Sequence, residues 1–375
     1  MNRKILKITA VFLAIFLLPI YVNAEDIKSE IPKFGYEKLD LAVKDKAEET
    51  AKDGAKLRFD VFTSDKRFIT VLVRAEGENG VRYKSTAYDK ECDRIITLKD
   101  ILSKSTDMET VNADLKLFAY SHFEDGFRES DDYDIVITEH SIGLCVEPDE
   151  DGKNGYICIF EKSGNPKLCS AFSDKKSIFP WEKAVAFTFD DGPSKYTDII
   201  LDFLEKNNSK ATFFILGEHA GDNAERIKRM KSLGCELGCH GYSHSDMRKQ
   251  STQKVNEEFS KTSDLIYKAC GERPTVFRAP YGEFSKSTSE VKLPRIKWSV
   301  DTMDWKTKNR QAVKDSILSC AKSGDIILLH DIFKTSAEGF CDAAEELKAA
   351  GYKLVTVSEL LDLKGEAGTK IYYRR

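Results

Sequence analysis

The sequence predicts an α/β fold in which a parallel sheet, open or closed into a barrel, follows a smaller α+β domain. After Trp181, short strand-like runs alternate with longer helical stretches through the rest of the chain. This alternation is typical of parallel strands connected by helices. Before Ser173, the patterns of β-hairpins predominate. We therefore place a domain boundary near Ser173–Pro180, which a length of 375 residues readily allows.

Residues 1–24 have the pattern of a secretory signal peptide. Basic residues at positions 3, 4 and 7 precede an uncharged apolar run, Ile8–Val22, and Ala24 supplies a small residue for cleavage. The run is shorter than the roughly 20 residues that a membrane-spanning helix needs. We expect a cleaved leader and a secreted protein that meets the membrane only transiently. The alternative is that the leader stays as an N-terminal anchor.

Residues 25–175 are expected to form the smaller α+β domain. The runs Phe68–Val73 and Val81–Thr86 flank an Asn79-Gly80 pair, which is a strong hairpin signal. Other expected elements are strands at Ile135–Ile137 and Ile142–Val146, each paired with Tyr156–Phe160, and helices at Lys44–Lys52 and Leu98–Ser105. This region contains no convincing set of catalytic residues.

Charge and cysteine content argue against two classes of protein. The formal net charge is −4 and no long block of Lys and Arg occurs, so we expect no nucleic-acid partner. The nine cysteines are odd in number and scattered, which does not fit a disulfide-rich scaffold. Cys145 and Cys158 flank a turn-rich stretch almost symmetrically, so a bridge between them is considered. We expect most of the cysteines to be buried free thiols.

The C-terminal domain, residues 180–363, is expected to contain seven strands: Ala184–Phe189, Ala211–Leu216, Glu236–Cys239, Thr275–Arg278, Ile296–Val300, Asp325–Leu329 and Lys353–Val357. Helices are expected between them at Thr197–Asn207, Ala224–Leu233, Thr252–Ala269, Ala312–Ala321 and Phe340–Ala349. In both open sheets and barrels of this kind, functional residues gather at the carboxyl ends of the strands.

The carboxyl ends of these strands carry many chemically useful side chains. They are Asp190 and Asp191; His240 and His244; Arg278, Pro280 and Tyr281; Asp301, Asp304 and Trp305; and Leu328 and His330. Three of the six histidines of the chain lie on this rim, and we assign the other three, His122, His140 and His219, structural roles. The rim therefore combines acids, an arginine, potential metal ligands and one further histidine.

Two adjacent aspartates, Asp190 and Asp191, follow the first strand of this domain, and their chemical roles have to be distinguished. Successive strand residues point to opposite faces, so Asp190 and Asp191 cannot easily share one role. His240 and His244 have the i,i+4 spacing that suits one metal ion, and two imidazoles with one carboxylate are a normal zinc set. We predict that one aspartate binds the metal while its neighbour acts as a base. The alternative is that both histidines are ordinary hydrogen-bonded loop residues.

The motifs FTFDDGPS, HGYSH, RAPY, DTMDW and LLH occur in this order. They resemble the five motifs of the NodB-type polysaccharide deacetylases, carbohydrate esterase family 4, over about residues 180–363. The resemblance implies a distorted (β/α)₇ barrel. It also implies a divalent metal cofactor, with zinc favoured and cobalt or another divalent ion as the alternative. The implied reaction is removal of acetyl groups from N-acetylglucosamine units or from acetylated xylan.

The resemblance also implies a role for each motif residue. Asp190 would be the general base, with Arg278 paired to it and orienting it. Asp191 would bind the metal together with His240 and His244. In the family, a backbone N–H helps the metal to stabilise the oxyanion, and in this chain that group belongs to Tyr281.

On the other side of the implied site, Asp304 would tune His330, the general acid. The substrate pocket would be formed by Pro280, Tyr281, Trp305 and Leu328, of which Trp305 and Leu328 would form the wall for the acetyl methyl group. These roles suit amide hydrolysis, which needs an activated water, a stabilised oxyanion and a proton for the leaving amine. Asp304 beside His330 should favour the imidazolium and so raise the pKa of His330. Asp301 is expected to cap a turn rather than to catalyse.

One position departs from the family pattern. Gly241 follows the first metal histidine, where the family usually has Ser or Thr. The missing hydroxyl would normally form a hydrogen bond within the loop. The spacing of the ligands is intact, so we expect activity, and the rigidity of the loop becomes a question for the structure.

We expect a secreted, metal-dependent hydrolase of carbon–nitrogen bonds that deacetylates N-acetylglucosamine in peptidoglycan. The choice of this cell-wall polysaccharide depends on the leader, the additional domain and the habit of the family. Alternatives are deacetylation of chitooligosaccharides or acetyl-xylan, an Fe(II) oxygenase with the same ligands, and a non-catalytic glycan-binding protein of the cell wall. Residues 25–175 weakly resemble domains upstream of such catalytic domains in Gram-positive surface proteins, and would position the enzyme on the wall.

Overall fold

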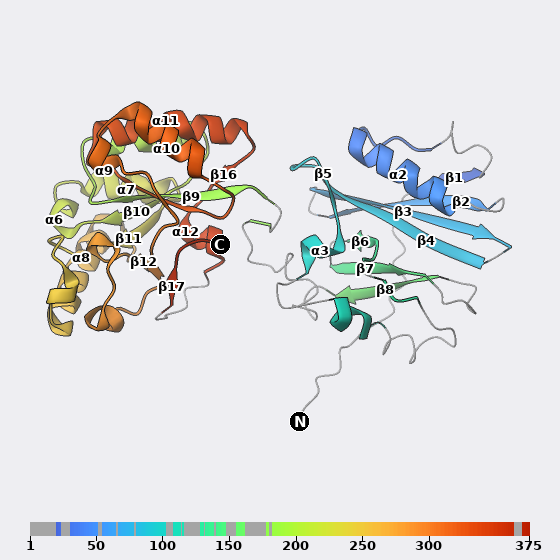
Figure 1. The fold of residues 1–375 in the computed structure, drawn as a ribbon, viewed down its shortest axis with the longest axis horizontal. Coiled ribbons are helices and arrows are strands. Elements are labelled where there is room, and N and C mark those ends of the chain that lie inside the picture. Colours follow the sequence, from blue (N-terminus) through green and yellow to red (C-terminus); the bar gives the residue numbers. More distant parts are fainter. Residues whose placement is uncertain are drawn as a thin grey trace, which may run out of the picture. The chain divides into compact units, whose positions relative to one another are not determined.

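The computed structural model contains two compact units, Met1–Trp181 and Glu182–Arg375 (Figure 1). The structure describes residues 20–23, 31–51, 55–64, 67–78, 80–102, 108–113, 115, 128–130, 132–138, 140–147, 155–161, 178–179, 182–363 and 370–375. Within the described residues, no helix is both long enough and apolar enough to cross a membrane.

Most of the predicted signal peptide lies outside the described residues. Its described part, Ile20–Asn23, forms strand β1, which runs antiparallel to β2 with Asn23 opposite Lys56. Cleavage of the leader therefore stays a prediction.

The N-terminal unit contains a five-stranded antiparallel sheet of order β1-β2-β3-β4-β5. Its remaining strands are β2 (Lys56–Ser64), β3 (Phe68–Gly77), β4 (Gly80–Asp89) and β5 (Arg94–Ile96). The predicted hairpin is confirmed, because β3 and β4 pair up to Gly77 opposite Gly80. Helix α2 (Glu37–Thr50) lies across this sheet (Figure 1) and buries Leu39, Val43 and Ala47, whose spacing of four residues places them on one face.

A second, three-stranded sheet follows in the order β6 (Ile135–Ile137), β7 (Ser141–Val146), β8 (Tyr156–Glu161). The predicted pairing of Ile135–Ile137 with Tyr156–Phe160 is wrong, because β7 lies between them and pairs with both. A connection of three residues after β6 suits a hairpin with β7 better than a longer return to β8. The nearby helix α3 (Leu98–Ile101) is shorter than predicted, and residues 103–105 lie outside the described part.

The register of β7 and β8 explains why Cys145 and Cys158 form no disulfide. Cys158 lies opposite Leu144 and Cys145 lies opposite Ile157. The two thiols therefore leave the sheet from opposite faces. Cys158 packs in one apolar cluster with Leu144, whereas Cys145 packs in another. All eight cysteines within the described residues are free.

The C-terminal unit is organised around a nine-stranded parallel sheet of order β14-β15-β9-β10-β11-β12-β13-β17, with β16 paired to β9. Its strands are β9 (Ala184–Asp190), β10 (Thr212–Ile215), β11 (Glu236–Cys239), β12 (Val276–Phe277), β13 (Arg295–Ile296), β14 (Val300–Asp301), β15 (Ile326–His330), β16 (Lys353–Leu354) and β17 (Ile371–Tyr372). The predicted parallel α/β architecture is confirmed. The sheet also includes Ile371–Tyr372, beyond the predicted end of the domain at residue 363.

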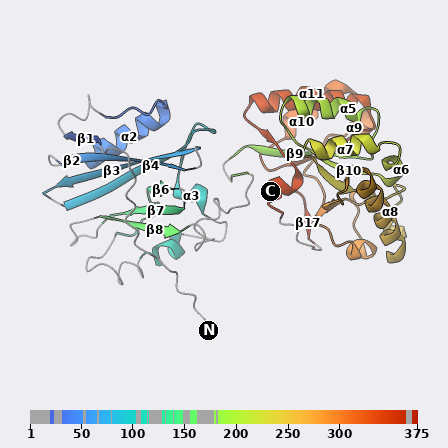
Figure 2. The same ribbon diagram turned by 180° about the vertical axis from the view of Figure 1, so that it is seen from behind.

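The helices of this unit are α5 (Thr197–Lys206), α6 (Gly217–Ala220), α7 (Ala224–Ser232), α8 (Thr252–Cys270), α9 (Asp304–Thr307), α10 (Arg310–Cys320), α11 (Lys334–Ala349) and α12 (Val357–Leu361). Three short 3₁₀ helices are η4 (Met247–Lys249), η5 (Pro280–Gly282) and η6 (Lys286–Glu290). Helices α10 and α11 lie side by side (Figure 1), and α5 lies between α11 and α7 (Figure 2).

One short segment joins the edge strand β14 to β13, the neighbour of the other edge strand β17, so the sheet is curled. The run predicted as a single strand, Ile296–Val300, is divided between β13, which pairs with β12 and β17, and β14, which pairs with β15. Three residues separate β13 from β14, which limits the distance between the end of β13 and the start of β14 to about 14 Å. Lys297 donates its N–H to Tyr372 (2.8 Å) and Ser299 donates to Ile326 (2.9 Å). This segment closes the predicted distorted (β/α) barrel.

Alternation along β9 decides which side chains enter the barrel. Val185, Phe187 and Phe189 pack in the core beneath the outer helices, and the rings of Phe187 and Phe189 lie 4.9 and 5.1 Å from that of Phe340 in α11. The intervening Thr188 and Asp190 therefore point to the interior. Every residue of β9 is buried because both faces of the strand are covered.

Candidate metal centre and catalytic site

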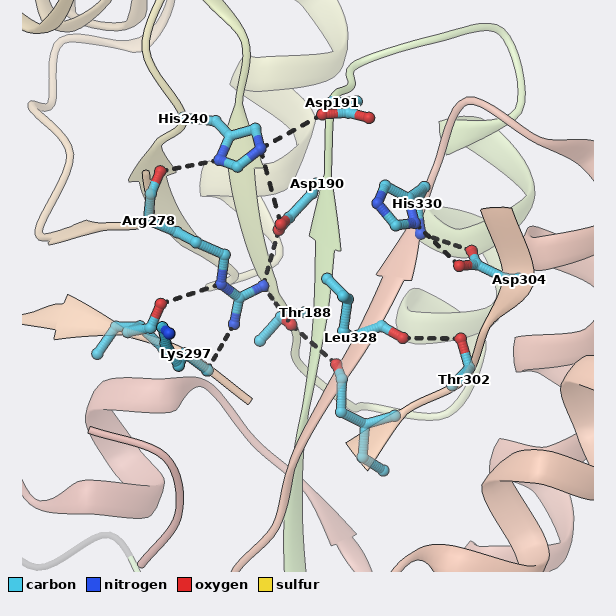
Figure 3. A network of polar contacts seen from close by, with 12 residues as sticks. Thr188, Asp190, Asp191, His240, Arg278, Lys297, Thr302, Asp304, Leu328 and His330 are labelled. Atoms are coloured by element: carbon cyan, nitrogen blue, oxygen red, sulfur yellow. Dashed lines mark hydrogen bonds and ion pairs between the residues drawn. The ribbon is translucent and has the colours of Figure 1, made fainter. Parts of the chain in front are cut away.

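The two adjacent aspartates lie at the end of strand β9 and in different surroundings. Asp190 is its last residue and is 3% exposed. Asp191 follows with a φ of +72°, a left-handed conformation that is uncommon for residues other than glycine. Beyond the end of the strand, the carboxylate of Asp191 lies near the histidines, while Asp190 lies beside Arg278 (Figure 3). The backbone thus gives the two carboxylates different surroundings, and the roles of metal ligand and base stay predictions.

The three predicted metal ligands come together at one point. The Oδ1 atom of Asp191 lies 3.3 Å from Nε2 of His240 and 3.3 Å from Nε2 of His244. One ligand atom from each residue lies within 4.8 Å of the others. The Nδ1 atom of His240 lies 2.8 Å from the carbonyl oxygen of Arg278, so Nδ1–H donates there and Nε2 keeps its lone pair for a metal.

Two features of Asp191 show that this group fits a divalent cation. Its Oδ1 atom is buried and has no hydrogen-bond partner, although a buried polar atom without a partner is costly. Burial alone would raise the pKa of Asp191, but the close approach of His240 and the charges of His240, His330 and His244 lower it to about 2. An ionised carboxylate with two imidazoles is a donor set that suits zinc and leaves positions for water and substrate.

Arg278 holds Asp190 by one carboxylate oxygen. The guanidinium is fully buried, and its Nη1 donates to Oδ1 of Asp190 (2.7 Å) and to Oγ1 of Thr188 (2.8 Å). Its Nε and Nη2 donate to the carbonyl oxygens of Ile296 (3.1 Å) and Lys297 (2.9 Å) in the segment that closes the barrel (Figure 3). Barrel closure therefore orients Arg278, and Arg278 orients Asp190.

The partly exposed His330 and the buried Asp304 form a second pair at the site (Figure 3). Oδ1 of Asp304 lies 2.9 Å from Nδ1 of His330, and Oδ2 accepts the backbone N–H of His330 (2.8 Å) and the hydroxyl of Ser336 (2.6 Å). Burial on its own would lower the pKa of His330, but the hydrogen bond and the charge of Asp304, with Asp190 and Asp191, raise it to about 9. The direction is the one expected from the sequence, and Nε2 remains available for a substrate.

The predicted pocket residues are distributed around this site. Leu328 is buried in β15 and lies between Asp190 and Asp304 (Figure 3). Trp305 is 47% exposed and donates its backbone N–H to Asp304 (2.8 Å). Pro280 is buried, whereas Tyr281 is 59% exposed, has a φ of +61° and places its ring 4.6 Å from the ring of His244. Oxyanion binding by Tyr281 and methyl recognition by this set stay predictions.

Sequence reasoning missed several residues that support the site. Thr188, two positions before Asp190 on the same face of β9, could have been found from strand alternation. Ser336 lies on α11, and no sequence signal connects it with Asp304. His219, assigned only a structural role, places Nδ1 2.7 Å from the carbonyl oxygen of Asp191. Asp301 accepts the backbone N–H of Met303 (2.9 Å), which is the turn-capping contact expected of it.

Asp331 supports the turn that follows Asp191. It is 1% exposed, and burial raises its pKa to about 7. The hydroxyl of Thr197 donates to its carboxylate, and a Cβ at Gly192 would lie 2.0 Å from its Oδ1 atom. Only glycine therefore fits after Asp191, which explains the glycine of the DDGP motif.

Comparison with known proteins adds an independent line of argument. A family model described as polysaccharide deacetylase matches residues 180–293. The peptidoglycan-N-acetylglucosamine deacetylase PgdA of Listeria monocytogenes is 41% identical over 192 residues, which cover 51% of this chain and 41% of that protein. A bifunctional xylanase/deacetylase of Pseudobutyrivibrio xylanivorans is 40% identical over 189 residues, covering 49% of this chain and 31% of that protein. The chain thus spans less than half the length of these two relatives.

A third relative is matched over most of its length. The peptidoglycan-N-acetylglucosamine deacetylase of Bacillus cereus is 34% identical over 197 residues, which cover 50% of this chain and 72% of that protein. All these matches involve about half of the present chain.

Proposed function

The chain belongs to the polysaccharide deacetylase family, and from this premise we propose that it hydrolyses the N-acetyl group of N-acetylglucosamine residues in peptidoglycan. One observation carries the proposal. A carboxylate with one free oxygen, Asp190, and a histidine with a pKa of about 9, His330, flank the metal-binding group of Asp191, His240 and His244. Base, metal ligands and acid are what hydrolysis of an amide requires.

Asp191, His240 and His244 would hold the metal, for which zinc is proposed and cobalt or another divalent ion is the alternative. A metal bound there would lower the pKa of its water and polarise the acetyl carbonyl. Oδ1 of Asp190 is engaged by Arg278, whereas Oδ2 lies 3.7 Å from Nε2 of His240, next to the ligands. Asp190 is therefore placed to take a proton from a water molecule at the metal.

His330 supplies the second proton transfer. Asp304 occupies Nδ1 of His330, so the proton on Nε2 is the one that can be donated. With a pKa of about 9, His330 is mostly protonated at neutral pH and can protonate the leaving amine. The N–H of Tyr281 would stabilise the oxyanion, and Leu328, Trp305 and Pro280 would enclose the acetyl methyl group.

Peptidoglycan is proposed as the polymer on two grounds. The printed names of the Listeria and Bacillus cereus relatives are those of peptidoglycan deacetylases. The predicted leader would deliver the enzyme outside the cell, to the envelope, where peptidoglycan is found. The relative from Pseudobutyrivibrio, named a xylanase/deacetylase, favours acetyl-xylan as the second candidate substrate.

The test is release of acetate by purified residues 25–375, supplied with zinc or cobalt. Substrates would be N-acetylglucosamine oligomers, peptidoglycan and acetyl-xylan, with Asp190→Asn and His240→Ala as controls. We expect metal-dependent release from peptidoglycan that both substitutions abolish, without consumption of oxygen. Faster release from xylan would reassign the substrate. No release from any polymer, with metal bound, would indicate a glycan-binding protein instead.

We also propose that residues 25–175 position the enzyme on the cell wall. Support comes only from the presence of a separate unit with its own apolar clusters and no catalytic set in its described residues. Binding of the full chain and of a variant lacking residues 25–175 to intact walls would be compared. Equal binding and equal activity on walls would contradict this role.

A further inference from the structure

The loop that carries both metal histidines has a strained backbone. It leaves β11 at Cys239 and reaches η4 at Met247. Gly241 has a φ of +81° and His244 a φ of +53°. A non-glycine residue in the left-handed region costs free energy, so His244 holds this conformation only if the surroundings impose it. Something outside the loop must therefore fix its shape.

Glu258, on helix α8, makes the contacts that fix it. Its carboxylate is 5% exposed, and its Oε2 accepts the backbone N–H groups of Tyr242 (2.7 Å) and Ser243 (2.9 Å). Its Oε1 accepts the hydroxyl of Ser243 (2.8 Å). In the part of the chain that the structure describes, Glu258 has no ion pair with Lys or Arg. Three hydrogen bonds from the loop are thus what compensates for burying this charge.

Thr262 adds a contact one turn further along α8. Its buried hydroxyl donates to the carbonyl oxygen of Gly241 (2.9 Å), which also accepts the N–H of Gly217 (2.9 Å). Residues four apart lie on the same face of a helix, so Glu258 and Thr262 form one surface against the loop. This surface reaches three consecutive residues between the two histidines.

These contacts answer the question raised by Gly241. A glycine offers no hydroxyl to the loop, and a Cβ at this position would approach Cε of Met247 to 2.7 Å. The loop cannot be stabilised from within at residue 241, so its order depends on α8. Sequence reasoning could not find Glu258, because an acidic residue on an amphipathic helix is normally solvent-exposed.

We propose that Glu258 is a positioning residue of the metal centre. By holding Tyr242 and Ser243, it keeps His240 and His244 where both Nε2 atoms lie 3.3 Å from Oδ1 of Asp191. Without it, the loop would sample conformations in which His244 no longer faces Asp191, and the metal would bind more weakly. The part of this inference that concerns affinity rests on the proposed function; the part that concerns loop order does not.

The test compares Glu258→Gln with Glu257→Gln in the full chain. Glu257 is the adjacent residue of α8, is 55% exposed and pairs only with exposed neighbours, so it controls for loss of one charge. The dissociation constants of zinc and cobalt would be measured by competition with a chelator, well below the melting temperature. Removing such an outer partner typically weakens metal binding about 10- to 100-fold, and we expect this for Glu258→Gln only.

Hydrogen exchange in the metal-free protein supplies the second readout. We expect the amides of Tyr242 and Ser243 to lose protection in Glu258→Gln and to keep it in Glu257→Gln. Ser243→Ala removes one of the three hydrogen bonds to Glu258 together with the contact between the hydroxyls of Ser243 and Ser245 (2.7 Å). It should weaken metal binding about three- to tenfold and guards against misfolding of the first variant. Unchanged affinity and unchanged amide protection in a folded Glu258→Gln protein would overturn the proposal.

The experiments distinguish failure of the proposed deacetylase function from failure of the proposed role of Glu258. If the wild-type chain binds zinc but releases no acetate, the proposed function fails while the affinity comparison still decides the role of Glu258. If it binds neither metal, exchange at Tyr242 and Ser243 decides whether Glu258 orders the loop.

Discussion

The site has two sides, and each contains a buried acid paired with a cation, Arg278 with Asp190 and the partly exposed His330 with Asp304. The member of the pair that is proposed to react differs between the two sides. On one side, the cation Arg278 positions the acid Asp190, which keeps one oxygen free of it. On the other, the acid Asp304 uses both oxygens to hold His330, which keeps Nε2 available. An ion pair does not itself define a role. In the proposed mechanism, the atom that each pairing leaves available, Oδ2 of Asp190 or Nε2 of His330, is the one that exchanges a proton.

The largest expected effect on activity comes from replacing the carboxylate of Asp190, whose Oδ2 atom is not held by Arg278. Asp190→Asn keeps the shape of the side chain but cannot accept a proton from water. We expect kcat/KM for acetate release to fall by about 10²- to 10⁴-fold. Binding of zinc should be retained, because Asp190 is not among the three ligands. A loss of less than tenfold, with metal bound, would remove Asp190 from the role of base.

Replacing the positioning cation should disturb both folding and activity. Arg278→Met leaves Asp190, Thr188 and two backbone carbonyls without their donor. Breaking a buried pair in this way typically costs about 3–5 kcal/mol of stability. Urea denaturation would measure this cost. Arg278→Lys serves as the conservative control, since it restores the charge but not the fork of donors, and stability as low as in Arg278→Met would show that this geometry dominates.

The pair of His330 and Asp304 should make the stability of the protein fall as the pH rises, which is the opposite of the effect of a typical paired carboxylate. Folding raises the pKa of His330 to about 9 from an ordinary value of 6.5. Its contribution to stability is therefore fully present below pH 6.5 and is lost as the pH rises through about 9. Between these limits, the urea midpoint of the metal-free protein should fall more for wild type than for His330→Gln. If the urea midpoints of the two proteins fell equally with pH, Asp304 would not stabilise the imidazolium of His330.

The smallest expected effect comes from the outermost support of Asp304. Ser336→Ala removes one of the donors to Oδ2 of Asp304 and leaves the backbone N–H of His330 in place. A hydrogen bond to a charged group contributes about 1.5–3 kcal/mol to stability, so a decrease in that range is expected, with kcat/KM changed only a few-fold. A loss of activity as large as that of Asp190→Asn would mean that Ser336 itself takes part in the reaction.

Much of the site could be predicted because its residues follow from strand periodicity. Apolar runs such as Ala184–Phe189 mark strands covered on both faces, and polar residues just after them must lie at one rim of a parallel sheet. Alternation along the strand separated Asp190 from Asp191 before their contacts were known.

Other features depend on partners that no local pattern records. The run Ile296–Val300 alternates apolar residues with Lys297 and Ser299, as a single strand would, so nothing in it shows that its two halves pair with different strands of the sheet. The turn-rich stretch before Cys158 does not set the register of β7 and β8, and a shift of one residue decides whether two thiols share a face. Glu258 was hidden because helical periodicity cannot distinguish an exposed acid from one that binds a loop.

The central claim is that His330, and not Asp304, is the reacting member of its pair. The pH dependence of kcat/KM for the zinc-loaded enzyme tests this claim most directly. In the proposed reaction the protonated form of His330 is the active one, which predicts a loss of kcat/KM as the pH rises through about 9. Asp304→Asn removes the largest favourable contribution to this pKa and should move the loss towards 6.5, whereas Asp190→Asn removes a smaller contribution and should lower the rate while moving the loss less. An alkaline limb that stays in place in Asp304→Asn would contradict the assignment of His330 as the general acid.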